Sequence, residues 1–416
     1  MTSSVLPVAS VAPEHPPYPQ LAEAIGTPAY VLDPTAIDAA ADAATRAFGE
    51  QWIRSYSLKA NPLPEVVSRL HARGWGANVV SLGEWEAARR AGVPNTETTM
   101  EGIGKTDTEL RAAIAAARDG DPLRWVSLET LDEARRCAQL CGPVPLDVLL
   151  RINPAVRPET HAGLAVGSAE SKFGLRGAEL RTLLHTDPFA GTGIRVRGVH
   201  VHVGSQLGEV TAWRDGALAA LETLDLVRAK HSGADTVDFG GGFPSIDAPS
   251  IDAPSEAGPS AGHFAAVLAD RTLPARCAIE PGRTLVAEAG SLLASVLHVR
   301  DLGGTQQVVL DTGMTELVRP ALYGARHPVR ALTAPDAPVL PTELHGPVCE
   351  SADRIGHYEL PSLHRGDLVL IGMAGAYSSV LETTYNGRPR APKVLLDPET
   401  GPRVVQDRER LAALRF

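Results

Sequence analysis

Two short stretches of the chain place a potentially reactive amine and a thiol among small or charged neighbours. "SYSLKANP" carries Lys59, in a chain where lysines are few and arginines many. A lysine among apolar and small residues can lose its proton and form a Schiff base with a carbonyl compound. "LHGPVCESADRIG" (344–356) places Cys349 beside Glu350, with Asp353 following. Taken alone, Lys59 is equally compatible with an ordinary lysine whose stem packs, and Cys349 with a structural cysteine.

Two glycine-rich stretches could hold an anion. "DFGGGFP" contains Gly240–Gly242, and "EPGR" spans Glu280–Arg283. Glycines let the backbone approach a ligand closely and turn N–H groups toward it, and Arg283 adds a fixed positive charge. One such loop could be a plain tight turn. Two loops of this kind at neighbouring strand ends favour a phosphate site.

A third stretch, "HVHVGSQ", places His200 and His202 on one face of an expected strand, with Ser205 just beyond it. A His-x-His strand can bind a metal, but the further ligands that such sites need are not evident, so no metal site is predicted. A buried, hydrogen-bonded histidine pair is the other alternative. The Ser205 hydroxyl could donate to a phosphate. An amine, a phosphate cradle and the Glu280 carboxylate together match what a protein supplies to pyridoxal 5'-phosphate (PLP), with Glu280 keeping a ring nitrogen protonated.

Alternating strand and helix patterns indicate how these residues are positioned. Eight β-rich runs are separated mostly by helical patterns; they lie at 53–57, 77–80, 98–102, 124–127, 146–152, 196–203, 236–239 and 276–280. Helix starts carry Ser81-x-x-Glu84 and Thr106-x-x-Glu109 capping signals. This rhythm predicts an α/β fold with a (β/α)8 TIM barrel, whose strand C-termini form the catalytic face. A doubly wound sheet is less well supported, because no Gly-x-Gly-x-x-Gly turn follows an early strand.

The rhythm changes after residue 285, where apolar strand-like runs alternate with Gly/Pro-rich turns. We therefore expect a PLP-binding barrel over 35–284 and a mostly β, barrel-like C-terminal domain over 285–416. Residues 26–34 contribute a strand to that β domain. The Pro-rich residues 1–25 predict a disordered tail, and the repetitive segment 245–262 predicts a flexible loop.

Composition restricts the partners and the compartment. The chain has 416 residues, a net charge of −10 and a pI near 5.7, which argues against nucleic acid or an anionic membrane as partner. It contains no run of 18 apolar residues and no signal-peptide pattern. Cys137 and Cys141 lie one helical turn apart and predict packing rather than a metal site. The four cysteines show no disulfide framework and favour a reducing cytoplasm.

These motifs, in this order from "GTPAYVLD" to "YNGRPRAPKVLL" (about 26–396), resemble the diaminopimelate decarboxylases, within the alanine-racemase-like fold family that includes ornithine decarboxylase. The resemblance implies that Lys59 bonds to the PLP aldehyde and that His202 stacks on the pyridine ring. Arg151 and Glu84 match supporting positions. The implied cofactor-binding set is Lys59, His202, Ser205, Gly240, Gly241, Gly242, Glu280, Gly282, Arg283 and Tyr377.

The resemblance also implies the reaction: decarboxylation of meso-2,6-diaminopimelate to L-lysine and carbon dioxide. Cys349 would be the catalytic acid that returns a proton after carbon dioxide leaves; a thiol, mostly protonated at neutral pH, can donate. Ornithine decarboxylases lack the clamp for the distal carboxylate and carry Asp where Glu350 stands. The implied substrate-binding set is Arg283, Arg319, Tyr323, Glu350 and Tyr377.

Two departures from the family leave room for another carboxylate-bearing diamino acid, in a natural-product or siderophore pathway. Asn78 stands where the family usually has Asp, and "EGIGK" replaces a "GNNK"-like segment. A racemase on the same fold should have a tyrosine base at the Cys349 position, and a non-catalytic homologue should have lost Lys59 or Cys349. The resemblance implies a homodimer in which each β domain completes the partner's site.

Overall fold

The computed structural model describes residues 18–158, 160, 162–245, 258–333 and 337–414. Two compact units are distinguished within these residues. The barrel unit begins at Ala40 and ends at Thr284; the β unit contains residues 18–39 and those from Leu285 onward. The segment 246–257, most of the predicted flexible loop, lies outside the described residues, as do residues 1–17 of the predicted tail.

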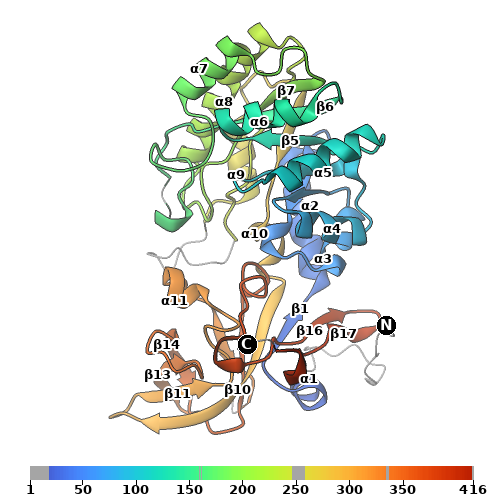
Figure 1. The fold of residues 1–416 in the computed structure, drawn as a ribbon. Helices are drawn as coiled ribbons and strands as arrows, with labels where there is room; N and C mark the ends of the chain where they lie inside the picture. The colour runs from blue at the N-terminus through green and yellow to red at the C-terminus, as the bar shows by residue number, and fades with distance from the viewer. Residues whose placement is uncertain (1–17, 159, 161, 246–257, 334–336, 415–416) are drawn as a thin grey trace. The chain divides into compact units, whose positions relative to one another are not determined.

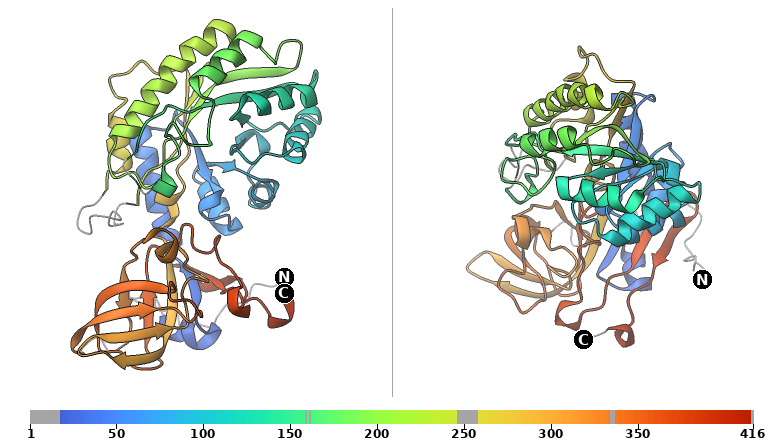
Figure 2. Two further views of the ribbon diagram at one scale, coloured as in Figure 1. Left: turned by 60° about the vertical axis from the view of Figure 1, so that its left-hand side comes forward. Right: turned by 45° about the horizontal axis from the view of Figure 1, so that its top comes forward.

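Eight parallel strands close into a barrel in chain order, which confirms the predicted (β/α)8 architecture (Figure 1, Figure 2). The strands are β2 (Ile53–Ser57), β3 (Gly76–Val79), β4 (Thr98–Met100), β5 (Trp125–Leu128), β6 (Leu146–Ile152), β7 (Ile194–Val201), β8 (Thr236–Asp238) and β9 (Arg276–Ile279). The helices around them are α2 (Pro34–Phe48), α3 (Pro64–His71), α4 (Leu82–Arg90), α5 (Asp107–Arg118), α6 (Leu131–Cys141), α7 (Gly177–Thr186), α8 (Thr211–Lys230), α9 (Ala261–Ala266) and α10 (Arg283–Val286).

Local capping explains where several barrel helices begin. The Ser81 hydroxyl accepts a hydrogen bond from the Glu84 N–H at the start of α4. Thr106 and Glu109 form the predicted capping box at the start of α5. Both thiols of α6, Cys137 and Cys141, are buried, as the packing interpretation expects.

The β unit is built on a mixed sheet in the order β14-β13-β11-β10-β1-β16-β17, with β15 pairing both β10 and β12. Its strands are β1 (Ala29–Leu32), β10 (Gly290–Asp301), β11 (Gln306–Leu310), β12 (Val329–Ala331), β13 (Val339–His345), β14 (Arg354–Pro361), β15 (Leu368–Ile371), β16 (Lys393–Asp397) and β17 (Gly401–Gln406). The predicted early strand, β1, pairs antiparallel with β10 and parallel with β16. The hairpin of β13 and β14 carries Cys349 in its connection.

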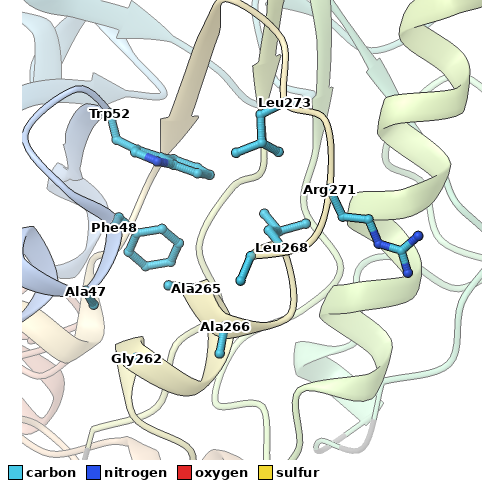
Figure 3. Close-up of a pocket in the computed structure, with 10 residues that line it drawn as sticks. Ala47, Phe48, Trp52, Gly262, Ala265, Ala266, Leu268, Arg271 and Leu273 are labelled. Carbon is cyan, nitrogen blue, oxygen red and sulfur yellow. The ribbon is translucent and has the colours of Figure 1, made fainter.

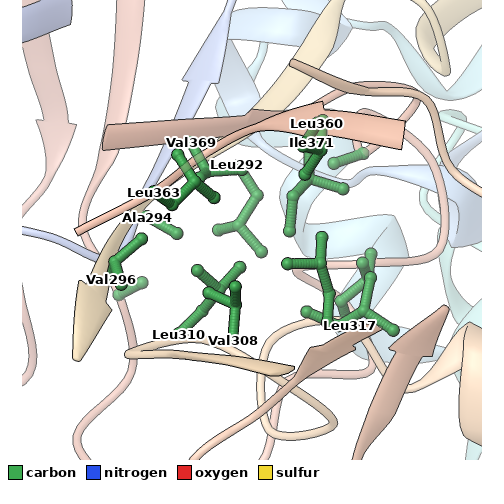
Figure 4. Close-up of a cluster of buried hydrophobic side chains, with 14 of the residues drawn as sticks. Leu292, Ala294, Val296, Val308, Leu310, Leu317, Leu360, Leu363, Val369 and Ile371 are labelled. Carbon is green, nitrogen blue, oxygen red and sulfur yellow. The ribbon is translucent and has the colours of Figure 1, made fainter. Parts of the chain in front are cut away.

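Leucine, isoleucine and valine side chains from several strands fill the core of the β unit (Figure 4). Leu310 and Val308 from β11 face Leu292 and Ala294 from β10, and Val369 and Ile371 from β15 complete the layer. Alternation along each strand places these residues on one face. The same core includes Leu344, so packing anchors the last residues of β13 just before the connection that carries Cys349.

The structure corrects the prediction of a disordered tail over 1–25. Tyr18–Ile25 form helix α1 instead. Tyr18, Leu21, Ala22 and Ile25 recur at helical spacing, and they pack with Val31, Leu293 and Val394 of the sheet. The proline content of the preceding residues masks this short amphipathic pattern. Among the described residues, no helix is long and apolar enough to cross a membrane.

Leu310→Ala should lower the free energy of unfolding by about 2–5 kcal/mol, because its fully buried side chain leaves a cavity. Leu302→Ala is the matched control: that side chain is 54% exposed and its loss should change stability by less than about 0.5 kcal/mol. Chemical denaturation of both variants measures the difference. Equal effects would contradict the packing of this core.

Candidate active site

Polar side chains line the interior of the barrel toward the C-terminal ends of its strands. Strand register places Ser57 opposite Asn78, and Asn78 opposite Thr99. On the other side, Arg151 lies opposite His200, and His200 opposite Asp238. All six residues are buried. An interior of this kind is costly unless its groups are paired or serve a ligand.

Lys59 follows β2 directly, in a short 3₁₀ turn over Leu58–Ala60, and is partly buried. The preceding Ser57 donates from its hydroxyl to the Glu280 carbonyl oxygen (3.0 Å) and from its N–H to the Pro281 carbonyl oxygen (3.1 Å). A Cβ at Gly282 would lie 3.1 Å from the Cβ atoms of Ala60 and Ser57. The "EPGR" loop therefore packs against the segment that carries the lysine.

Glu280 is buried at the end of β9 and contacts a histidine between two carboxylates. Its Oε2 lies 3.4 Å from His200 Nε2, while His200 Nδ1 lies 2.8 Å from Glu101 Oε2 and 3.0 Å from the Ser127 hydroxyl. The indole N–H of Trp125 donates to Glu101 Oε1 (3.2 Å). Among the described residues, Glu280 Oε1 has no hydrogen-bond partner although it is buried.

The charges in this interior shift one another's ionisation. Burial alone would lower the pKa of His200, but Glu101 and Glu280 outweigh it and raise that pKa to about 10. Burial would raise the pKa of Glu280, whereas His200 and Lys59 lower it below its usual value. Burial and the nearby Glu280 charge raise the pKa of Asp238 well above its usual range. At neutral pH His200 is therefore a cation and Glu280 an anion, while Asp238 keeps its proton to a higher pH than an ordinary aspartic acid does.

His202 lies two residues beyond His200 on the same face. Burial, followed by the charges of Lys59 and Arg151, holds its pKa well below the usual value, so the ring is neutral. The Gly241 N–H donates to His202 Nδ1 (3.0 Å), which leaves the ring's remaining N–H on Nε2. This bond fixes the orientation of a flat, uncharged ring at the barrel mouth.

The glycine loop after β8 combines close approach with internal hydrogen bonding. A Cβ at Gly241 would lie 2.4 Å from the Glu280 carbonyl oxygen, and Gly240 has φ +68°. The Gly240 N–H donates to Asp238 Oδ1 (2.9 Å), and that of Gly241 to His202. Two of the three N–H groups expected to face an anion are thus directed to side chains of the protein. Gly242, at φ +102°, follows them.

Ser205 and Arg283 meet at the same end of the barrel. Arg283 Nη2 lies 3.3 Å from the Ser205 hydroxyl oxygen, to which it donates. Thr160 donates to the Ser205 carbonyl oxygen (2.7 Å), which holds the turn after β7. A hydroxyl and a guanidinium beside glycine loops form a cradle suited to a phosphate.

Two further predicted positions are occupied by paired groups. Arg151 donates to Glu129 Oε1 (2.7 Å), both side chains being buried, and its guanidinium lies 4.8 Å from the Phe173 ring centre. Glu84 Oε2 accepts a hydrogen bond from the Val80 N–H (2.9 Å). The positive charge of Lys59 acts on the Glu84 carboxylate, whose pKa burial raises.

Asn78, the departure from the family pattern, is 1% exposed. Neither its amide nitrogen nor its amide oxygen has a hydrogen-bond partner among the described residues. It lies opposite Ser57, two residues before Lys59. An unsatisfied buried amide costs stability, so its retention is consistent with a ligand that completes the barrel interior.

The β unit carries the other predicted residues. Asp353 is buried in the connection between β13 and β14; Oδ1 accepts from the Met314 N–H (2.6 Å) and Oδ2 from the Val348 N–H (2.8 Å). A Cβ at Gly346 would lie 2.3 Å from these oxygens. This carboxylate thereby holds the turn that presents Cys349, whose side chain is exposed.

Glu350 is also exposed, and its Oε1 accepts a hydrogen bond from the Tyr385 hydroxyl (2.7 Å). That bond, together with the Glu350 charge, raises the pKa of Tyr385. Cys349 also acts electrostatically on Tyr385. These three exposed residues form one polar cluster on the β unit.

Arg319 begins the short helix α11 (Arg319–Tyr323) and is 9% exposed. Its Nη1 lies 3.4 Å from His327 Nε2. His327 Nδ1 lies 3.0 Å from the Gly372 carbonyl oxygen, so the hydrogen is assigned to Nδ1 and Nε2 accepts from the guanidinium. Tyr323 ends α11 and is partly buried, and Tyr377 adopts φ +55°, a strained value for tyrosine.

The barrel interior thus gathers Lys59, His202, Ser205, Glu280 and Arg283, while Arg319, Tyr323, Cys349, Glu350 and Tyr377 belong to the β unit. Sequence reasoning missed the roles of Glu101, Asp238, His327 and Tyr385. Glu101 and Asp238 lie near the C-terminal ends of predicted strands (98–102 and 236–239), and acids at that position were a usable signal. His327 lies in a loop and Tyr385 begins a single 3₁₀ turn, and in neither place does a periodic pattern identify a contact.

A hollow on the outside of the barrel is not part of this site (Figure 3). Its volume is about 390 Å³, and Phe48, Trp52, Leu268 and Leu273 face it, with Arg271 at one side. Among the described residues that line it, Arg271 alone carries an ionisable side chain. The interior cluster, by contrast, combines shifted pKa values, unsatisfied polar atoms and glycine loops.

Comparisons with known proteins identify the family. Residues 35–287 match the pyridoxal binding domain of the pyridoxal-dependent decarboxylases. Diaminopimelate decarboxylase from Deinococcus radiodurans is 37% identical over 378 residues, covering 90% of this chain and 91% of that protein. The enzyme of that name from Zymomonas mobilis is 30% identical over 390 residues, covering 91% and 90%.

Solved structures lead to the same family as the sequence comparisons. Diaminopimelate decarboxylase from Helicobacter pylori, complexed with L-lysine, matches with a TM-score of 0.85 at 29% identity, covering 95% of this chain and 97% of that one. Lysine/ornithine decarboxylase from Vibrio vulnificus, complexed with putrescine, matches with a TM-score of 0.77 at 25% identity, covering 91% and 97%. The sequence match, the barrel and the ordered site motifs lead to one conclusion: the chain belongs to the pyridoxal-dependent decarboxylase family.

Proposed function

We propose that this protein is a PLP-dependent decarboxylase that converts meso-2,6-diaminopimelate to L-lysine and carbon dioxide. The observation that carries the proposal is the buried Glu280, whose Oε1 has no hydrogen-bond partner among the described residues and whose pKa the charges of His200 and Lys59 lower against the effect of burial. Such an oxygen would accept a hydrogen bond from the protonated pyridine nitrogen of PLP. The named relatives support diaminopimelate as the substrate.

The residues fit PLP at each of its functional groups. Lys59 would bond to the aldehyde, the neutral ring of His202 would lie against the pyridine, and Glu280 would hold the ring nitrogen. Ser205, Gly242, Gly282 and Arg283 would surround the phosphate, with Tyr377 adding a hydroxyl. When bound, PLP supplies an electron sink that accepts the electron pair left behind by departing carbon dioxide.

The substrate's far end accounts for the residues of the β unit. Arg319, Tyr323 and Arg283 would bind the distal carboxylate, because a guanidinium matches a carboxylate in charge and shape. His327 holds the Arg319 guanidinium by accepting one of its hydrogen bonds. Glu350 would accept hydrogen bonds from the distal ammonium group, and Tyr385 orients that carboxylate by donating to its Oε1.

Cys349 would return a proton to the carbon that lost carbon dioxide. The support is its position: the thiol is exposed, next to Glu350, on a turn that Asp353 holds from beneath. In the homodimer that the family resemblance implies, the Cys349 turn of one chain would complete the barrel site of the other. Small-molecule recognition then involves both units, one from each subunit.

Another carboxylate-bearing diamino acid is the second candidate substrate, and Asn78 favours it. An amide in place of the family's acid changes the charge near Lys59. Purified protein should be incubated with PLP and meso-diaminopimelate, lysine, ornithine or arginine, and carbon dioxide measured. Release from diaminopimelate alone supports the proposal. Absence of release from all four, with PLP bound, would favour the alternative substrate.

Arg319→Ala should reduce kcat/KM for diaminopimelate, because a desolvated carboxylate loses its charged partner. The expected loss of transition-state stabilisation is about 2–5 kcal/mol. Arg365→Ala removes an exposed arginine of the same unit and is the matched control. Steady-state kinetics of both variants measure the effect. Near-normal kinetics in Arg319→Ala would indicate a substrate without a distal carboxylate.

Mixing two inactive variants tests the shared site. Lys59→Ala and Cys349→Ala homodimers should each lose most activity, whereas refolding them together creates hybrids with one native site. At equal mixing half the dimers are hybrids and half their sites are native, so roughly a quarter of wild-type activity should return. If hybrids form, as mass spectrometry would detect, and activity stays absent, Cys349 does not act on the partner's barrel.

Asn78→Leu should stabilise the cofactor-free protein by about 1–3 kcal/mol, because it removes two unsatisfied polar atoms from the interior. The same change should weaken PLP binding, since the amide would no longer face the ligand. Asn95→Leu is the control: Asn95 is buried but bonded to Trp85, Arg89 and Asp121, so its replacement should destabilise. Denaturation and PLP titration measure both properties. Destabilisation by Asn78→Leu would show that the amide has a partner in the folded protein.

A further inference from the structure

Four side chains form a continuous polar row across the barrel interior. Trp125 from β5 donates to Glu101 beyond β4, Glu101 contacts His200 in β7, and His200 contacts Glu280 beyond β9. The side chains of His200, Glu101 and Glu280 are at most 4% exposed. Because four different strands contribute, the barrel's closure fixes the order of the row.

Because these side chains are buried, their charges must be balanced by one another and not by water. Two buried carboxylates near each other would repel, and one would take up a proton unless a cation lay between them. His200 occupies that position, with one ring nitrogen toward each acid. The charged or titratable groups that act on it or lie opposite it are Glu101, Glu280, Asp238, His202 and Arg151, and Ser127 contributes a hydroxyl.

We propose that His200 is a positioning residue that acts as a buried cation, held by Glu101, which keeps Glu280 ionised and directs its Oε1 toward the cofactor ring. The inference rests on the proposed function for the identity of the group that Glu280 meets. It adds two residues, His200 and Glu101, that do not contact the substrate. Their contribution is to maintain the charge of the one carboxylate that does contact the ring.

A metal site is the competing explanation for the same residues. Glu101, His200 and Glu280 each offer a ligand atom, and these atoms lie within 4.8 Å of one another. However, both nitrogens of His200 face carboxylate oxygens, and a pKa of about 10 means that both carry hydrogens at neutral pH. A metal ion would therefore have to displace a proton from His200 before it could bind there.

The first test uses protein without cofactor. Nitrogen-15 NMR of histidine-labelled protein should show the His200 ring doubly protonated at pH 7 and losing its proton only as the pH approaches about 10. In Glu101→Gln the same transition should occur at lower pH. A neutral His200 ring at pH 7 in the wild-type protein would overturn the proposal.

Stability against pH provides a second readout without cofactor. A raised histidine pKa stabilises the fold fully below the unfolded value near 6.5 and loses that contribution as the pH rises through the folded value. The stability advantage of wild type over His200→Gln should therefore shrink between pH 6.5 and about 10. His364→Gln, at an exposed position, should show no such trend. A constant difference would mean that His200 contributes packing alone.

The third test adds PLP. His200→Gln should weaken PLP binding at least about tenfold, and at saturating PLP should lower kcat with little change in KM, because Glu280 becomes protonated while the substrate contacts remain. Glu101→Gln should show the same defect at pH 8 and recover at pH 6, where His200 regains its proton. Absence of that recovery would contradict the role of the cation.

Metal analysis separates the remaining outcomes. Stoichiometric zinc or manganese in wild-type protein, lost in both His200→Gln and Glu101→Gln, would overturn the proposal in favour of a metal site. Failure of wild-type protein to bind PLP would defeat the proposed function instead. The two experiments on cofactor-free protein would still decide whether His200 is a buried cation.

Discussion

The placement of charge inside a closed parallel barrel constrains the rest of this structure. A carboxylate as buried as Glu280 would normally take up a proton, because burial disfavours its charged form. Here the His200 cation and Lys59 lower its pKa, while burial and the Glu280 charge raise the pKa of Asp238. The glycine loop after β8 depends on the same arrangement, since the Gly240 and Gly241 N–H groups bond to Asp238 and His202.

The β unit solves a different problem, which is to hold an exposed turn in one conformation. Cys349 and Glu350 have little packing of their own, because both are exposed. Asp353 lies beneath the turn against Gly346, with backbone N–H groups as donors to both of its oxygens. Burial raises the pKa of Asp353, and these N–H donors oppose that rise. Because its oxygens are bonded to the backbone, Asp353 serves as a structural anchor for the turn. The exposed side chains are then available for chemistry.

Some buried polar atoms in the barrel interior lack hydrogen-bond partners, which lowers stability and is typical of a functional site. Asn78 and Glu280 retain polar atoms without partners among the described residues. Other buried polar groups of the barrel are paired, as at Asn95 and between Arg151 and Glu129 Oε1, although further buried atoms such as Trp75 Nε1 and Trp213 Nε1 also have no partner among the described residues. A ligand bound between Lys59 and the glycine loops would complete the hydrogen bonds of Asn78 and Glu280.

The sequence by itself determined the barrel strands, the early strand of the β domain and the helix caps, because these depend on local periodicity and on contacts three residues apart. It also identified Lys59, Glu280 and the glycine loops, since strand ends in a parallel barrel converge. Only the tertiary structure decided that Glu101 and His200 support Glu280, that His327 holds Arg319, and that Tyr18–Ile25 form a packed helix. Those relations join residues far apart in the chain or depend on burial, and ionisation in particular follows from the groups that folding brings together.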